Sequence, residues 1–225
     1  GRLTTIIGGR SIDMPRIEVL GQLTLPTRLQ VAKGTSLLVA RIYPYANSLF
    51  FPNRIVELRN ESIDLSTILS SEAITLSNKL DCAKTLEQKV DILDCFFIER
   101  LSRNQEQIKK AQLIAELCHT LCRESVFDVH RLAEKFRVSD RYIQKLFEST
   151  VGLTPRAFFN TNRFNKSAER IRHTDEQLTS VAYSCGYFDQ AHLIKEFKNF
   201  TGITPSDARR YSALRMQQQN NKISN

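Results

Sequence analysis

The sequence lacks the long apolar run that a membrane-spanning helix requires. No uninterrupted stretch approaches the roughly 18 residues needed to cross a bilayer, and residues 1–10 do not follow the plan of a signal peptide. We therefore expect a soluble, cytoplasmic protein. The chain also has no Met at position 1, which suggests a processed or truncated piece of a longer protein.

The motifs of common enzyme classes are missing as well. The sequence has no glycine-rich phosphate loop, no nucleophile elbow and no metalloprotease helix motif. Scattered acidic residues such as Glu57, Glu61 and Asp64 are more typical of a solvated surface or of helix starts than of an acid–base pair. We therefore expect no catalysed reaction and no cofactor.

Metal ligands are sparse. No histidine precedes His119, which excludes a cupin-type site with histidine ligands from the N-terminal part. The five cysteines are at positions 82, 95, 118, 122 and 185. Cys118 and Cys122 lie one helical turn apart, but a structural zinc needs four ligands and no second pair follows at a suitable spacing. The cysteines are better explained as small buried residues than as disulfides, and a redox-sensing thiol is a weaker alternative.

The charge balance is basic. The formal net charge of +8 favours a polyanionic partner. A solvated basic protein without such a partner would carry the same excess. The placement of the charges therefore has to decide between these interpretations.

The C-terminal half contains an internal repeat. Five residues recur 50 positions later: Lys145, Phe147, Gly152, Thr154 and Pro155 are followed by Lys195, Phe197, Gly202, Thr204 and Pro205. Self-similarity at a fixed period marks one supersecondary unit that is used twice. Each copy predicts a helix with a buried Phe, a Gly suited to a left-handed C-terminal cap, and a Thr-Pro that starts another helix.

A shorter helix and a turn precede each copy. The apolar residues of these helices fall on one face: Val129, Leu132, Ala133 and Phe136 in the first, and Leu178, Val181, Ala182 and Cys185 in the second. Ala133 and Ala182 are small enough to let a second helix approach closely. Ser139 and Asp189 are suitable N-caps for the helices that follow. This order of helix, tight turn and second helix is the plan of a helix-turn-helix unit.

The doubled pattern also resembles a known family. It includes Leu132-Ala133, Ser139 to Phe147, Gly152 to Pro155, Val181-Ala182, Gly186 to Gln190, Phe197-Lys198 and Gly202 to Pro205. On these segments, residues 125–212 closely resemble the tandem helix-turn-helix domain of AraC/XylS-type bacterial transcription regulators. The resemblance implies a regulator of transcription, an activator more than a repressor, with promoter DNA and RNA polymerase as partners. A homodimer, and a small-molecule effector of the full-length protein, are open under this resemblance.

The second helix of the first unit carries candidate DNA-reading side chains. Readout in the major groove needs side chains that present paired donors or acceptors from an exposed helix face. The predicted helix 140–149 buries Ile143, Leu146 and Phe147 and leaves Arg141, Gln144 and Lys145 on its other face. The resemblance aligns these three with base-contacting positions, where Arg can contact guanine, Gln adenine, and Lys guanine or phosphate. The alternative is that Arg141 and Gln144 are ordinary exposed helix residues that contact no DNA.

The corresponding helix of the second unit offers fewer specific groups. Leu193 and Phe197 are expected to be buried, and the presented residues are Gln190, Ala191, His192 and Lys195. The resemblance aligns Gln190 and Lys195 with base- or backbone-contacting positions, and Lys195 is more typical of a phosphate anchor. Ala191 offers only a methyl group to a thymine, and His192 could pack against the turn or bind a phosphate. Ser139 and Thr179, near helix starts, are candidate phosphate donors.

A long helix is predicted between the two units. In residues 155–173, the inward residues are Phe158, Phe159, Phe164, Ala168 and Ile171. About 18 residues at 1.5 Å each give roughly 27 Å, of the order of one DNA turn. A single chain could therefore address two successive major grooves.

The N-terminal part predicts a few strands followed by helices. Residues 16–25 and 36–43 are the clearest strand candidates. An apolar stripe predicts a helix from about 86 to 103, followed by another over 108–123; the stripe consists of Leu86, Val90, Leu93, Phe97 and Leu101. It fits packing on neighbouring helices, with a dimer seam as the alternative. Region 18–70 is faintly similar to the later part of a sensor domain of the same family, in which case the first half of its sandwich and a complete effector pocket are missing.

These observations predict a mainly α chain with a small N-terminal β portion, an α+β fold. The expected divisions are a partial sensor or regulatory region at 1–104, a tandem helix-turn-helix domain at 105–215 and a disordered tail at 216–225. One alternative is an alkyl-transferase enzyme that borrows the DNA-binding domain, although the sequence has no Pro-Cys-His stretch. The other is a non-specific DNA-binding or protein-interaction module.

Overall fold

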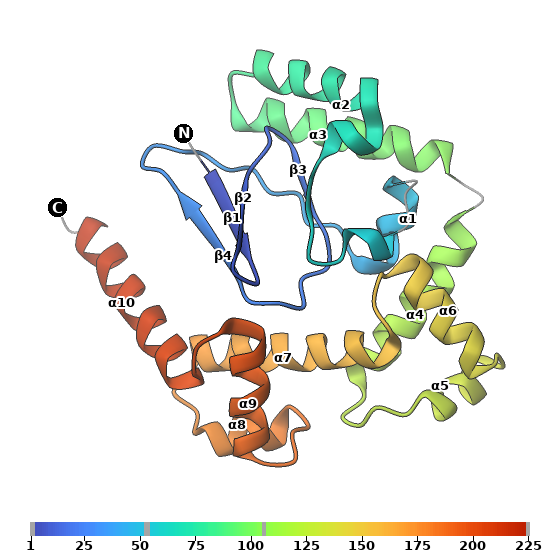
Figure 1. Cartoon of the computed structure of the whole chain (residues 1–225), viewed down its shortest axis with the longest axis vertical. Coiled ribbons are helices and arrows are strands. Elements are labelled where there is room, and N and C mark those ends of the chain that lie inside the picture. The colour runs from blue at the N-terminus through green and yellow to red at the C-terminus, as the bar shows by residue number, and fades with distance from the viewer. Residues whose placement is uncertain (1–2, 52–54, 105–106, 224–225) are drawn as a thin grey trace.

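The computed structural model describes residues 3–51, 55–104 and 107–223, and its secondary structure is mainly helical with a small N-terminal β part (Figure 1). The strands are β1 (Leu3–Ile7), β2 (Arg10–Asp13), β3 (Glu18–Leu20), β4 (Thr27–Val31) and β5 (Ser62–Asp64). β1 lies between β2 and β4 in an antiparallel sheet, in which Thr5 pairs with Ile12 and Leu29. β3 and β5 form a separate antiparallel pair. The predicted fold class is confirmed.

The two strand predictions were less accurate. Residues 16–25 contain only the three-residue strand β3, and residues 36–43 contain no strand. Apolar, β-branched composition is not sufficient, because a strand needs a neighbour that pairs its backbone groups. Residues 36–43 run without such a neighbour among the residues that the structure describes, and the Val39 side chain is 71% exposed.

Helices follow the sheet. Two 3₁₀ turns, η1 (Pro44–Ala46) and η2 (Ile55–Leu58), flank the short α1 (Asn47–Phe50), and three longer helices come next: α2 (Leu65–Cys82), α3 (Leu86–Arg103) and α4 (Ile108–Arg123). The predicted helices at 86–103 and 108–123 are confirmed as α3 and α4. The Thr85 hydroxyl caps α3 by accepting a hydrogen bond from the Gln88 N–H at 3.2 Å, and the Gln88 side chain accepts from the Thr85 N–H. This reciprocal capping box fixes the start of the helix.

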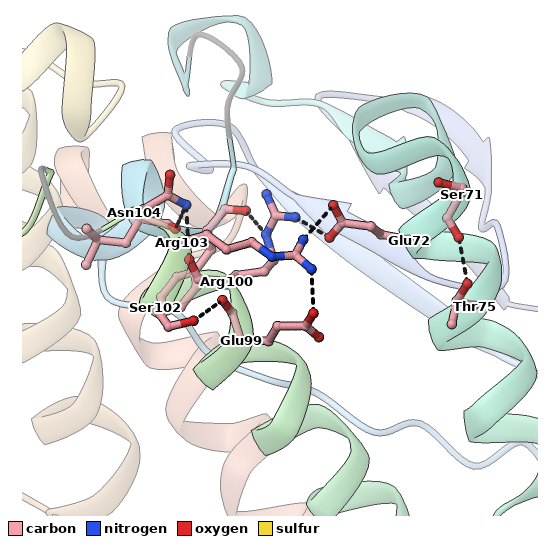
Figure 2. Close-up of polar contacts among 10 residues, drawn as sticks. Ser71, Glu72, Thr75, Glu99, Arg100, Ser102, Arg103 and Asn104 are labelled. Atoms are coloured by element: carbon pink, nitrogen blue, oxygen red, sulfur yellow. Dashed lines mark hydrogen bonds and ion pairs between the residues drawn. The ribbon is translucent and has the colours of Figure 1, made fainter.

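A buried arginine joins α3 to α1 and α2 (Figure 2). The Arg100 guanidinium donates to the Glu72 carboxylate of α2 at 2.6 Å and to the Phe50 carbonyl of α1 at 2.5 Å. Arg103 adds a second contact to Glu72 at 3.3 Å. The Asn104 amide donates to the Leu49 carbonyl at 2.8 Å. Arg100 is therefore paired on both sides, as a buried charge must be to remain stable.

The apolar stripe of α3 is covered only in part. Leu93 packs into the core that α2 shares with the second β pair, and the Phe97 ring contacts Phe50 with centroids 5.1 Å apart. Leu86, Val90 and Leu101 remain exposed. The stripe therefore serves packing through Leu93 and Phe97, and its use as a dimer seam stays a prediction.

The C-terminal half consists of two small cores that share one helix. Its helices after α4 are α5 (Val129–Phe136), α6 (Asp140–Thr150), α7 (Pro155–His173), α8 (Leu178–Ser184), α9 (Gln190–Thr201) and α10 (Pro205–Ile223). α7 contributes Phe159 to the first core, with α4, α5 and α6, and Phe164 and Ile171 to the second, with α8, α9 and α10. Figure 1 shows α7 as a long rod with α5 and α6 near one end and α8 and α9 near the other. The predicted linker helix is confirmed.

The last helix extends further than the composition suggested. α10 continues to Ile223, whereas a disordered tail was predicted from Met216, and residues 224–225 lie outside the described residues. Gln, Arg and Met are good helix formers, so a helix that has already started at Pro205 can continue through this polar segment. Within the described part of the chain, no helix has the length and apolar character that crossing a bilayer would need.

Candidate nucleic-acid interface

The first helix-turn-helix unit is built on small and apolar residues of α5 and α6. Leu132 and Ala133 of α5 are buried with Ile143 and Phe147 of α6, and both α6 residues have no exposed surface. The turn is made by Arg137, whose φ of 54° is left-handed. A side-chain capping bond fixes the start of α6: the Ser139 hydroxyl accepts a hydrogen bond from the Tyr142 N–H at 3.2 Å. The burial of one face leaves the other face of α6 to solvent.

Three polar side chains occupy the open face of α6. Arg141, Gln144 and Lys145 are all exposed. Among the described residues, none of these three side chains forms a hydrogen bond or an ion pair. The N-terminal region, which packs near α6 through η1 and η2, does not cover them. Their donors and acceptors are therefore available to a ligand.

The second unit repeats this arrangement with α8 and α9. Val181 and Ala182 of α8 are buried against Leu193 and Phe197 of α9, and each is at most 1% exposed. The turn contains Gly186 at a φ of +78°, where an added Cβ would lie 2.6 Å from the Ser125 carbonyl oxygen. Both the backbone conformation and the space therefore require glycine at this position.

The start of α9 presents residues of unequal exposure. Gln190, Ala191 and Lys195 are exposed. The Thr179 hydroxyl donates to Gln190 Oε1 at 2.7 Å, which orients the amide and leaves its NH₂ group and the second lone pair of Oε1 for a ligand. His192 is half-buried, because its ring packs against Tyr187 with centroids 5.2 Å apart and its Nε2 lies 3.8 Å from a Glu196 oxygen. His192 thus faces the turn more than the solvent.

A polar cluster behind α9 fixes this helix on α7. Arg163 of α7 and Glu196 of α9 form an ion pair at 2.5 Å, and the Tyr187 hydroxyl donates to Glu196 at 2.9 Å. The Arg163 guanidinium also lies over the Tyr187 ring, 4.4 Å from its centroid. Burial, followed by the charge of Glu196, raises the pKa of the Tyr187 phenol, which therefore stays neutral and can donate this bond.

The sequence analysis missed three residues of this surface and its support. It assigned no role to Arg163 or Glu196, and it quoted Phe188 only as part of the segment from Gly186 to Gln190. One signal was available, since Glu196 lies 50 residues after Leu146, a buried position of the first unit. A charge at a core position calls for a buried partner.

Two helix-turn-helix units on a shared rigid helix, each with an open polar face on its second helix, define a DNA-binding domain. Residues 132–211 match the family model described as a helix-turn-helix domain. This part of the chain is a helix-turn-helix domain of the AraC/XylS type.

Curated relatives are similar to part of the chain. The HTH-type transcriptional activator RhaS of Citrobacter koseri is 35% identical over 78 residues, which cover 35% of this chain and 28% of that protein. RhaS of Escherichia coli (strain SE11) is 27% identical over 134 residues, which cover 57% of this chain and 48% of that protein. The chain therefore spans less than half the length of these relatives.

Solved structures include the DNA-binding domain of AdpA, described as a global transcriptional factor in complex with a target DNA. It is 26% identical to this chain, with a TM-score of 0.42, and the match covers 48% of this chain and 96% of that one.

Proposed function

We propose that the protein is a sequence-specific DNA-binding regulator of transcription, an activator, and that α6 and α9 enter two successive major grooves. The observation that carries the proposal is the pair of uncovered polar faces, with Arg141 and Gln144 on α6 and Gln190 on α9. Each face lies on the second helix of a unit, which is the helix that reads bases in this motif. The name of the RhaS relatives, transcriptional activators, supports activation over repression.

Discrimination between sequences would come mainly from three side chains. Arg141 has the forked donors that match guanine, and Gln144 and Gln190 have the donor and acceptor pair that matches adenine. Because Thr179 already orients the amide of Gln190, this residue can engage a base with little loss of side-chain freedom. The α6 face carries more donors than the α9 face, so the first half-element should be the better defined.

The remaining site residues would bind the backbone of the duplex. Lys195 is an exposed cation near the start of α9, and Lys145 has the corresponding place on α6. The Ser139 hydroxyl accepts from the peptide N–H of Tyr142, so its own proton can be donated to a phosphate. Thr179 and His192, which are engaged with Gln190 and Glu196, would contribute through these neighbours or by a weak phosphate contact. Phosphate contacts set orientation and affinity more than sequence choice.

The helix α7 sets the separation of the two readers. Its 19 residues span about 28 Å, against roughly 34 Å for one turn of DNA. A separation of this order suits two grooves on one side of a duplex, with modest bending.

The proposal has consequences for the whole protein. Residues 105–215 would read DNA and residues 1–104 would serve as a partial regulatory region, with no reaction catalysed by either. RNA polymerase would be the protein partner, and the compartment would be the bacterial cytoplasm at the nucleoid. A homodimer through the exposed ends of the α3 stripe, and an effector of a longer form of the protein, are open extensions of the proposal.

Selection from a pool of randomised duplexes tests this function. We expect a recovered motif with two half-elements about one helical turn apart, the first more strictly defined than the second. Competition with random duplex at one fixed salt concentration should then leave the selected duplex bound. A pool without enrichment, or equal competition by random DNA, would identify a non-specific binder instead.

A further inference from the structure

The two turns of the repeat differ in length by one residue. Before the turn, equivalent residues of the two units are 49 positions apart in the sequence, for example Ala133 and Ala182. After the turn they are 50 positions apart, for example the N-caps Ser139 and Asp189. The second turn therefore holds one residue that has no counterpart in the first.

Hydrogen bonds locate the extra residue. In the first unit the Val138 N–H donates to the Ala133 carbonyl at 3.1 Å, and in the second the Tyr187 N–H donates to the Ala182 carbonyl at 2.9 Å. Val138 and Tyr187 are thus equivalent, and both pack into the core of their unit. In the first unit the N-cap follows at once. In the second, Phe188 stands between Tyr187 and the N-cap Asp189, so Phe188 is the insertion.

The side chain of Phe188 points away from the protein. It is 84% exposed, the highest value among the large hydrophobic residues of the described part of the chain. The core does not need it, because Tyr187 already fills the place that Val138 occupies in the first unit. It lies directly before the N-cap of α9, two and three residues ahead of the exposed Gln190 and Ala191 in the chain. The N-terminal end of a recognition helix is the part that reaches base edges.

We propose that Phe188 determines specificity by contacting the 5-methyl group of a thymine in the second half-element. This inference rests on the proposed function and adds a readout to α9. A phenyl ring has no hydrogen-bond donor or acceptor with which to hold a phosphate. The apolar group that a base pair offers in the major groove is the methyl of thymine, and Ala191 adds a second apolar surface close by in the chain.

The proposal predicts a difference between the two readers. In the first unit Val138, the equivalent of Tyr187, directly precedes the N-cap Ser139, so no ring lies in front of α6. The exposed ring of α6 itself, Tyr142, lies beyond the cap, and this helix reads through Arg141 and Gln144. The second unit, with one exposed amide and this ring, reads methyl groups in addition. Its half-element should therefore require thymine at one position or two neighbouring positions where the first half-element does not.

Replacing single thymines by deoxyuridine tests this, because the change removes only the methyl group. The duplex recovered by selection would be substituted at each thymine in turn, and Kd measured with the unaltered chain and with Phe188→Ala. We expect the unaltered chain to lose about fourfold in affinity at one or two positions of the second half-element, the factor for one methyl withdrawn from water. Phe188→Ala should weaken binding to the thymine duplex by at least that factor and lose its sensitivity to deoxyuridine there.

Two further variants serve as controls. Phe188→Leu keeps an apolar side chain and should retain part of the methyl sensitivity. Tyr183→Ala removes an aromatic that is 65% exposed on α8 of the same unit and should leave the deoxyuridine pattern unchanged.

The possible outcomes distinguish a failure of the methyl contact from a failure of the proposed DNA-binding function. If selection yields no motif, the proposed function fails. If a motif is recovered but Phe188→Ala keeps the full deoxyuridine pattern, or binds DNA as the unaltered chain does, the methyl contact is refuted and Phe188 is assigned to a protein surface. Since the side chain is exposed, circular dichroism should show unchanged folding of the variant.

Discussion

Arg163 and Glu196 form an ion pair at 2.5 Å in which both side chains are nearly buried, 12% and 13% exposed. The pair joins α7 to α9, the helix that presents Gln190 and Lys195. At the equivalent position of the first unit, α6 carries the buried Leu146. The two recognition helices are therefore held by different chemistry, one through an apolar contact and the other through a charge pair.

Removing one partner of this pair should destabilise the second unit. In Glu196→Ala the guanidinium of Arg163 stays buried without its partner, and Tyr187 loses its acceptor. We expect a loss of about 3–5 kcal/mol in the free energy of unfolding, measured by urea denaturation. Glu148→Ala, an exposed carboxylate on α6, should change it by no more than about 0.5 kcal/mol.

Replacing both partners distinguishes the pair from the packing around it. Arg163→Leu combined with Glu196→Leu gives the second unit the residue type of the first and leaves no buried charge. We expect the double variant to recover most of the stability that Glu196→Ala loses. A double variant as unstable as the single one would mean that the packing of the long side chains, and not their charge, holds α9.

Arg141→Ala tests direct base readout by α6. We expect it to weaken binding to the selected duplex by about 1–3 kcal/mol and to relax the preference at one base position. Titration against duplexes varied at each position measures both effects. Arg59→Ala, an exposed arginine of the N-terminal region, is the charge-matched control, and an equal loss with Arg141→Ala on all sequences would contradict base readout.

Lys195→Ala should behave differently, because a phosphate contact carries no sequence information. We expect weaker binding to selected and random duplexes alike. The slope of log K against log salt should become shallower by about 1. Titrations at four or more salt concentrations give the slope, with Lys109→Ala on α4 as an exposed control. An unchanged slope would remove Lys195 from the phosphate-binding set.

The cysteines should differ in reactivity. Burial raises the pKa of the Cys118 thiol, and burial also raises that of Cys122, which lies against α7 through the bond from Lys166 to its carbonyl. A raised pKa means less thiolate, the reactive form, at any pH below it. At pH 8 a thiol reagent should modify the exposed Cys82 and Cys95 first, and Cys118 only on unfolding. Mass spectrometry of the digested protein gives the order in which the cysteines are modified. Fast labelling of Cys118 in the native protein would contradict the prediction.

Local signals predicted most of the helical fold. The apolar spacing from Leu86 to Leu101 placed α3, and the repeat of Phe147 at Phe197 placed two cores, because burial of one face at helical spacing is a property of a short segment. The absence of a strand at 36–43 was not predictable in this way, since strand pairing depends on whether another extended segment of the folded chain lies beside it. The continuation of α10 was missed for a different reason: its Gln- and Asn-rich composition favoured disorder, but Gln, Arg and Met are good helix formers and the helix had already started at Pro205.

The candidate site was predictable in part. The exposed positions of Arg141, Gln144 and Lys195 followed from the helical period, and their contacts to DNA stay predictions. The support of α9 was not visible, because Arg163 and Glu196 are 33 residues apart and each looks solvated in its own segment. The exposure of Phe188 depends on how many residues separate a left-handed turn position from an N-cap, which the 50-residue period alone conceals.

The shared helix α7 has a consequence for evolution of the binding site. Each residue of an α-helix turns the chain by about 100° while it advances only about 1.5 Å. One residue gained or lost between Phe159 and Phe164 would hardly alter the distance between the two readers but would point one of them away from the duplex. Seven residues, close to two full turns, would restore the direction at a spacing about 10 Å longer. Length variation in this connector should therefore be tolerated in whole turns, each step selecting operators with a different gap.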